Sequence, residues 1–182
     1  MEPMRHPTGF MSPQLSGKGG AFYLWSTAGL FAPGIVPPRW MGAAAPKIDK
    51  LYYGFDTERL YIRIELKDGR EFRKVLEDKQ LVIRLLEPEG WQFRLTENKE
   101  QAELKTFRGE EEKSVALDFA VEDVLEMSLP FKELGLNPGD RIIFAVNLIS
   151  PDGDLVERFP LSGGFMEIPV PDQRYFDKYW YV

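Results

Sequence analysis

The sequence predicts an all-β protein, an antiparallel β-sandwich of immunoglobulin-like or jelly-roll-like type. Short apolar segments alternate with polar residues at the two-residue period of a half-buried strand. Turn signals separate these segments about every eight to twelve residues, and no long segment has helical apolar spacing. A chain of 182 residues suits one domain, and we expect about nine to eleven strands in it.

The first 20 residues are predicted to form an extended arm, because Pro3, Pro7 and Pro13 are interspersed with glycines. The arm either packs on the body through its apolar residues or frays as a terminus. The sandwich domain then spans residues 21–182. Residues 21–25 are an aromatic strand candidate, and residues 26–46 form a long loop of the kind that often carries function.

Residues 47–66 are expected to form the central hairpin of a sheet that the rest of the chain wraps. Leu60, Ile62 and Ile64 alternate with polar or aromatic residues, as in a strand with one buried face. An apolar run precedes them, and the polar residues 56–59 lie between the two runs. A four-residue loop around a type I turn fits this break.

The middle of the chain continues the strand pattern. Residues 67–78 are charged and contain an Asp-Gly turn. Residues 80–86 are apolar at nearly every position, which predicts a strand covered on both faces. Further strands are expected at 91–95, 102–107 and 115–119. Residues 121–129 fit either a helix or a strand, and the neighbouring strands favour a strand for their second half.

The C-terminal third is predicted to hold a second hairpin. Residues 131–136 form one helical turn that ends at Gly135. A long central strand at 141–149 pairs with a strand at 155–159 across a Pro-Asp-Gly turn. A last short strand lies within residues 161–170, and Trp180 and Tyr181 seal the terminus against the sheet.

Composition restricts the partners. The net charge of −6 argues against nucleic acid, which needs a basic face. No apolar segment is long enough for a membrane span, and the N-terminus lacks the apolar stretch of a signal peptide. The chain has no cysteine, so disulfides and thiolate metal sites are excluded. We expect a cytoplasmic protein, and the abundant Glu, Lys and Arg fit a thermophile.

Catalytic and metal-binding motifs are sparse. The single histidine, His6, stands on the Pro-rich arm, which argues against a catalytic triad or a histidine metal site. A glycosidase site built from two carboxylates stays an open alternative, although the acidic residues fall mainly in turns and on outer strand positions. No cofactor is expected apart from calcium, for which Asp152 and Asp154 are weak candidate ligands, because such turns more often bind nothing.

Aromatic side chains offer another kind of site. Sugars present C–H faces that stack on exposed rings, while their hydroxyls need polar partners. Trp40 lies in the long loop, where a core role and a binding role are equally consistent with the sequence. Trp25 and Trp91 are more typical of core positions.

Six segments together carry a resemblance to a known family. They are residues 6–17, 21–31, 47–66, 127–149 and 157–171, and the closing Tyr179-Trp180. In this order, over nearly the whole chain, they resemble the C-terminal β-domain attached to many glycoside hydrolase family 57 proteins. The resemblance implies a sandwich like the glucodextranase C-terminal domain, which is similar to family 9 carbohydrate-binding modules and DOMON domains.

The resemblance implies a non-catalytic accessory domain, because the family 57 catalytic residues lie on a separate (β/α)7 barrel. The chain departs from the family pattern at residues 15–17, at Leu24 and at residues 39–42, where the family commonly has other, more polar residues.

Our first hypothesis is therefore a module that binds α-glucan or another carbohydrate for a partner hydrolase. Stacking would come from Trp40, Trp25 and Tyr23, with Arg39 and Asp49 as polar contacts. The second hypothesis is a structural module that docks a family 57 catalytic barrel or forms a homodimer. An independent enzyme is the least supported alternative.

Overall fold

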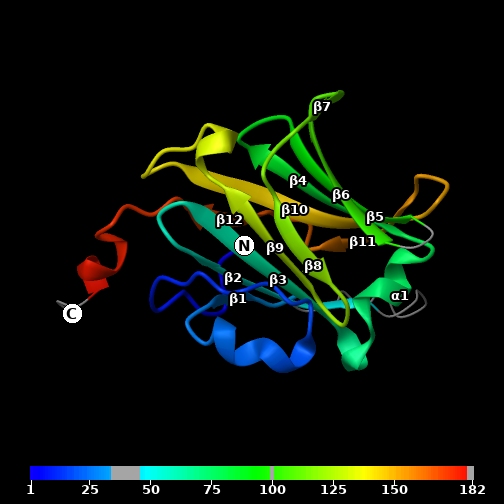
Figure 1. Ribbon diagram of the computed structural model, residues 1–182, viewed down its shortest axis with the longest axis horizontal. Coiled ribbons are helices and arrows are strands. Elements are labelled where there is room, and N and C mark those ends of the chain that lie inside the picture. The colour runs from blue at the N-terminus through cyan, green and yellow to red at the C-terminus, as the bar shows by residue number, and fades with distance from the viewer. Residues whose placement is uncertain (34–45, 99–100, 180–182) are drawn as a thin grey trace.

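Two antiparallel sheets pack face to face in the computed structural model, which describes residues 1–33, 46–98 and 101–179 (Figure 1). The five-stranded sheet has the order β1-β2-β3-β9-β8. The seven-stranded sheet has the order β11-β10-β4-β5-β6-β7, and β12 also pairs with β10. The predicted β-sandwich is confirmed, and the described residues form twelve strands rather than the expected nine to eleven.

The strands of the smaller sheet are β1 (Gly29–Phe31), β2 (Ile48–Phe55), β3 (Arg59–Leu66), β8 (Asp118–Val121) and β9 (Leu125–Pro130). Those of the larger sheet are β4 (Gln80–Glu87), β5 (Trp91–Asn98), β6 (Gln101–Arg108), β7 (Glu111–Lys113), β10 (Arg141–Ile149), β11 (Leu155–Phe159) and β12 (Met166–Pro169). The helices are short: η1 (Gly19–Trp25), η3 (Lys67–Gly69), α1 (Phe72–Leu76), η4 (Lys132–Leu134) and η5 (Tyr175–Tyr179).

The predicted hairpin occupies the centre of the five-stranded sheet. Tyr53 on β2 faces Ile62 on β3, and β3 is flanked on its other side by β9. The alternation read from the sequence is the one observed: Leu60, Ile62 and Ile64 point into the core and are fully buried. The core lies between the two inner sheet faces, as expected for a sandwich.

Residues 21–25 do not form the predicted strand. They belong to the 3₁₀ helix η1, which lies outside the five-stranded sheet on the side away from the larger sheet (Figure 1). Aromatic residues favour strands locally, but Trp25 is fully buried against the outer face of this sheet. Tertiary packing therefore overrides the local preference.

Helix α1 was not expected from the charged stretch 67–78. Phe72, Val75 and Leu76 are its buried residues, at the i, i+3, i+4 spacing of a helix face. The strand at 80–86 is covered on both faces only in its centre, where Leu81, Val82 and Ile83 are all buried.

The N-terminal arm lies along the five-stranded sheet. Met4 N and Arg5 N donate to Leu30 O, and Leu30 N donates to Arg5 O, so the arm covers the β1 edge. Farther along, Met11 N donates to Phe55 O. The division into an arm of residues 1–20 and a sandwich of residues 21–182 stays a prediction, for which the Discussion gives a test.

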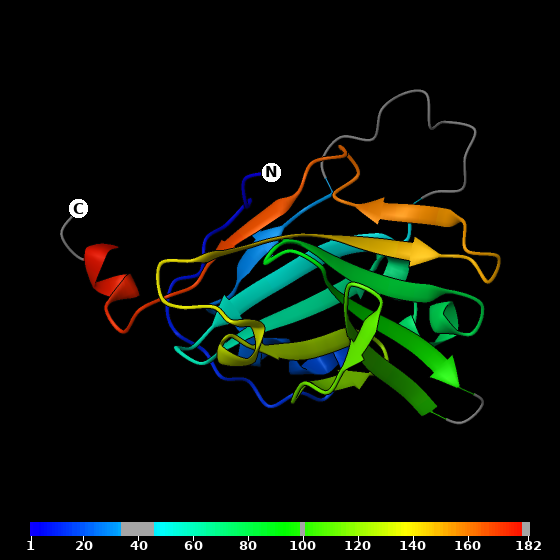
Figure 2. The same ribbon diagram turned by 90° about the horizontal axis from the view of Figure 1, so that it is seen from above.

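The C-terminal helix η5 stands at one end of the sandwich in both views (Figures 1 and 2). The Phe176 ring lies 5.8 Å from that of Phe55 and 4.8 Å from that of Phe10, so the two ends of the chain meet in one aromatic cluster. Trp180 and Tyr181, predicted to seal the terminus, lie outside the described residues. Within the described ranges, none of the helices has the length and apolarity needed to cross a membrane.

Candidate functional site

The outer faces of the two sheets differ sharply in exposure. On the five-stranded sheet, Tyr52, Arg63 and Glu126 point outward and are nevertheless buried. On the seven-stranded sheet, Arg84 and Lys105 point outward and are exposed. The arm and η1 explain the difference, because they cover only the smaller sheet.

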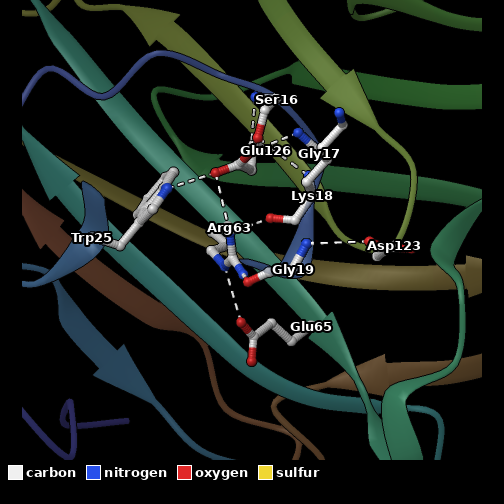
Figure 3. A network of polar contacts seen from close by, with 9 residues as sticks. All are labelled: Ser16, Gly17, Lys18, Gly19, Trp25, Arg63, Glu65, Asp123 and Glu126. Atoms are coloured by element: carbon white, nitrogen blue, oxygen red, sulfur yellow. Dashed lines mark hydrogen bonds and ion pairs between the residues drawn. The ribbon is translucent and has the colours of Figure 1, made fainter. Parts of the chain in front are cut away.

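A network of polar contacts fastens this cover (Figure 3). Glu126 Oε1 accepts hydrogen bonds from Gly17 N at 2.7 Å and Ser16 N at 3.0 Å. Its Oε2 accepts one from Trp25 Nε1 at 2.5 Å and lies 3.3 Å from Arg63 Nη1. The carboxylate thus ties the arm and η1 to the sheet, and its acceptors are occupied from within the protein.

Arg63 completes the network. Its Nε donates to Glu65 Oε2 at 2.9 Å, and its Nη2 donates to Gly19 O at 3.1 Å. The Phe22 ring lies over the guanidinium at 5.7 Å. A buried charge needs such a set of partners, and the Arg63 guanidinium has them. We therefore interpret this network as a structural feature and not as a binding site.

The outer face of the seven-stranded sheet, over which neither the arm nor η1 lies, is the candidate site. Strand register places two rows of side chains on it, at neighbouring levels of the sheet. The first row is Arg158, Asn147, Val82, Arg94 and Lys105, and the second is Ala145, Arg84, Gln92, Phe107 and Glu112. Their strand neighbours, such as Leu81, Ile83 and Phe93, point into the core, so alternation fixes which side chains face outward.

Two arginine–phenylalanine pairs lie on this face. The Arg94 guanidinium lies 4.6 Å from the centroid of the Phe107 ring, and its Nη2 donates to Gln92 Oε1 at 3.1 Å. The Arg158 guanidinium lies 4.9 Å from the Phe165 ring, and its Nη1 donates to Pro160 O at 3.2 Å. A planar guanidinium group stacked on a ring is held in one orientation, whereas the ammonium group of a lysine sits on a flexible chain.

Small apolar residues and one amide lie between these pairs. Val82 and Ala145 are small and almost completely buried. Next to them, Asn147 is half-buried, and its Oδ1 has no hydrogen-bond partner among the described residues. We call the whole set the outer platform: Val82, Arg84, Gln92, Arg94, Phe107, Ala145, Asn147, Arg158 and Phe165.

Burial perturbs one charge on the outer platform. Desolvation lowers the pKa of the Arg158 guanidinium below its ordinary value. None of the described carboxylates forms an ion pair with this arginine. The platform thus contains a partly desolvated cation without a compensating anion.

The site residues expected from the sequence are scattered. Trp25 is fully buried and donates to Glu126, so its ring offers no face to a sugar. Tyr23 is 74% exposed on η1, and Asp49 is half-buried near the start of β2. No described contact joins Tyr23 to Asp49. Arg39 and Trp40 lie outside the described residues.

The weak calcium candidates lie in the turn between β10 and β11. Asp152 and Asp154 are exposed there. Over the described part of the chain, three or more His, Cys, Asp or Glu side chains nowhere gather in a metal-binding arrangement. The turn therefore adds no support to the calcium hypothesis.

Sequence reasoning did not single out the outer platform. Arg84, Arg94 and Phe107 are each visible as outward positions in alternating strands. Which of them become neighbours depends on the order β10-β4-β5-β6, and strand order is not readable from periodicity.

No family model matches the chain, and no curated protein matches it. A family 9 carbohydrate-binding module from Caldicellulosiruptor kristjanssonii, solved in complex with glucose, has a similar structure. It shares 13% identity with a TM-score of 0.50, over 89% of this chain and 93% of that one. The cellotriose complex of a family 9 module from the same organism has 11% identity and a TM-score of 0.47, over 91% and 93%. At such identities, the likeness to the glucose complex establishes a shared β-sandwich fold.

Proposed function

We propose that this chain is a non-catalytic carbohydrate-binding module that holds its ligand on the outer platform. The fold is similar to that of a module whose structure contains glucose. The observation that carries the proposal is the platform itself, in which rings, guanidinium groups and amides lie together on the outer face of the seven-stranded sheet. Rings and guanidinium planes stack on the C–H faces of sugars, and the polar groups bind hydroxyls.

Calorimetric titration tests the proposal. Glucose, cellotriose and maltoheptaose are titrated into the wild-type protein, the Phe107→Ala variant and the Tyr23→Ala variant. We expect Phe107→Ala to weaken binding about fivefold, since loss of a stacking ring costs about 1 kcal/mol. Tyr23→Ala is the matched control, because it removes an exposed ring that lies outside the platform.

Two results would contradict the proposal. Absence of binding heat with all three sugars at millimolar concentration would argue against a sugar site. A loss confined to Tyr23→Ala would move the site to η1. Trp40→Ala extends the series to the loop residue that the sequence indicated.

The biological context that we propose is an accessory domain of a glycoside hydrolase family 57-type protein, with α-glucan as the bound polymer. The sequence resemblance supports this context. Native gels containing soluble starch provide the measurement: wild-type protein should be retarded relative to gels without starch, and Phe107→Ala less so. Unchanged migration of the wild type would remove α-glucan as the ligand.

The edge strand β11 favours a second candidate function, a structural module that pairs with another chain. Leu155 is 59% and Val156 41% exposed there, and exposed edge strands are sites of pairing. The partner would be a second copy of the chain or a catalytic barrel. Light scattering after size exclusion distinguishes the homodimer: Val156→Lys should convert it to a monomer, whereas a monomeric wild type contradicts it.

A further inference from the structure

The outer platform has an unbalanced positive charge. Four described arginines pair with carboxylates: Arg59 with Asp118, Arg63 with Glu126 and Glu65, Arg73 with Glu97 and Glu122, and Arg141 with Glu87 and Glu167. Of the arginines that do not, Arg5, Arg70, Arg108 and Arg174 lie apart from one another, whereas three lie together on the platform. Arg84, Arg94 and Arg158 form no ion pair with any described carboxylate. The imbalance arises in a protein of net charge −6, so overall composition does not explain it.

Each of the three arginines is available in a different way. Arg84 is exposed, and the described residues give it neither a hydrogen bond nor an ion pair. Arg94 and Arg158 are half-buried and are positioned by Phe107 and Phe165. Arg158 has lost part of its hydration, because desolvation lowers its pKa. A ligand carboxylate would restore to this cation the charge partner that the protein lacks.

The arrangement fits a chain of separated anions better than a compact one. Arg84 and Arg94 are diagonal neighbours on β4 and β5, with Cα atoms about 7 Å apart. Arg158 is three strand spacings from Arg94, or about 14 Å. A single phosphate contacts several cations at one point, whereas a polymer with a carboxylate on each sugar meets cations spaced along a flat face.

We propose that the outer platform binds an acidic polysaccharide, a chain of uronic-acid sugars whose carboxylates pair with Arg84, Arg94 and Arg158. This inference rests on the proposed carbohydrate-binding function, and it puts an acidic polymer in the place of the neutral α-glucan as the ligand. Phe107 and Phe165 supply the apolar contacts of the sugar faces, and Gln92 and Asn147 bind hydroxyls.

Competing charges border the platform. Glu87 and Glu167 flank Arg141 at one end of the sheet, and Glu103 accompanies Lys105 at the other. Both clusters pair internally, and the exposed Glu112, opposite Phe107 on β7, lies at the far edge of the face. The centre of the face is thus left to the three unpaired arginines. The bound chain therefore lies across the strands, over β11, β10, β4 and β5.

Titration with tetragalacturonate and with maltotetraose tests the proposal. The wild-type protein should bind tetragalacturonate at least tenfold more tightly, with an affinity that falls as sodium chloride is raised. The double variant Arg84→Gln/Arg94→Gln should lose at least tenfold in affinity for tetragalacturonate and little for maltotetraose. Its matched control is Arg70→Gln/Arg174→Gln, which removes the same charge from exposed arginines outside the platform.

The outcomes separate this inference from the proposed function. The acidic substrate would be overturned if maltotetraose bound as tightly as tetragalacturonate and both double variants bound the sugars like the wild type. The proposal of a carbohydrate-binding module would then remain. Absence of binding by both sugars, together with failure of glucose and cellotriose, would overturn the proposed function and this inference with it. If poly-L-glutamate displaces tetragalacturonate and binds as tightly as that sugar, the platform is a general polyanion site. This result would also overturn the inference. Circular dichroism of each variant verifies that it is folded.

Discussion

At the scale of single residues, Glu126 connects the most distant parts of the chain. It is completely buried, and it accepts hydrogen bonds from Ser16, Gly17 and Trp25 while pairing with Arg63. A buried charge pair is costly to break, because the remaining partner stays desolvated. The carboxylate is therefore the residue on which the arm and η1 most depend.

Replacing Glu126 by glutamine should lower the free energy of unfolding by about 3–5 kcal/mol, because Arg63 loses its buried counter-charge. In addition, the new side-chain amide N–H group faces two N–H donors that now bind the carboxylate. Urea unfolding followed by tryptophan fluorescence measures the change. Glu65→Gln is the control: Glu65 is partly exposed, so its replacement should cost about 1 kcal/mol or less. Equal unfolding midpoints for the two variants would show that Glu126 has no special role.

Tyr61 should make stability depend on pH in alkaline solution. Burial, followed by the Asp56 carboxylate, raises the pKa of the Tyr61 phenol, whose hydroxyl donates to Asp56 Oδ2 at 3.1 Å. The folded state thus favours the neutral phenol. This contribution to stability is complete below the unfolded pKa of about 10 and is lost as the pH rises through the higher folded value.

Tyr61→Phe should therefore lower the free energy of unfolding by about 1 kcal/mol at pH 7, because the substitution removes the hydrogen bond to Asp56. Above pH 10, the stability of this variant should fall less than that of the wild type. Urea unfolding at a series of pH values measures both effects. Tyr23→Phe, at an exposed position, should keep the wild-type slope. A wild-type slope in Tyr61→Phe would rule out Tyr61 as the titrating group.

At the scale of elements, the arm is a packed part of the sandwich. Its Met11 side chain lies directly over Gly54 of β2, where any Cβ would overlap Met11 Sδ. Gly17 has φ +70°, and a Cβ there would meet the backbone nitrogen of Glu122 at 2.9 Å. The glycines are thus required by close approach of the arm to the sheet and to the β8–β9 turn.

Gly54→Ala should destabilise the protein by about 1–3 kcal/mol, because the new methyl group displaces Met11. The double variant Met11→Ala/Gly54→Ala should cost less than the sum of the two single variants, since the shortened side chain leaves room for the methyl. A double-mutant cycle by urea unfolding measures this coupling. Strict additivity would mean that Met11 does not pack on Gly54 in solution.

At the scale of the whole molecule, the question is whether arm and sandwich unfold together. Lys18 is an exposed trypsin site, but its carbonyl accepts from Arg63 Nη1 at 3.4 Å, and the flanking Gly17 and Gly19 nitrogens are hydrogen-bonded. Cleavage after Lys18 should therefore proceed no faster than global unfolding. Rapid cleavage with intact β-sheet circular dichroism would mark the arm as a separate unit, as the sequence division at residue 20 implies.

The sequence by itself determined the longer strands and their inner faces, whereas the predicted strand at 21–25 was wrong and β1 lies within the predicted loop 26–46. Leu60, Ile62 and Ile64 alternate with outward residues whatever lies beyond them, and Gly135 ends the turn of η4 with φ +75° as predicted. These features depend on neighbours two to four residues away, which periodicity and turn chemistry record. The β-sandwich class follows from their number and spacing.

Only the tertiary structure decided what covers each sheet and which outward residues become neighbours. The segment around Trp25 is a 3₁₀ helix because Glu126, 101 residues later, accepts its indole N–H and the sheet buries its ring. The outer platform exists because β11, β10, β4 and β5 lie side by side, which brings Arg158, Arg84 and Arg94 onto one face. The physical reason is that strand pairing and burial join residues far apart in the chain, whereas local sequence patterns describe only near neighbours.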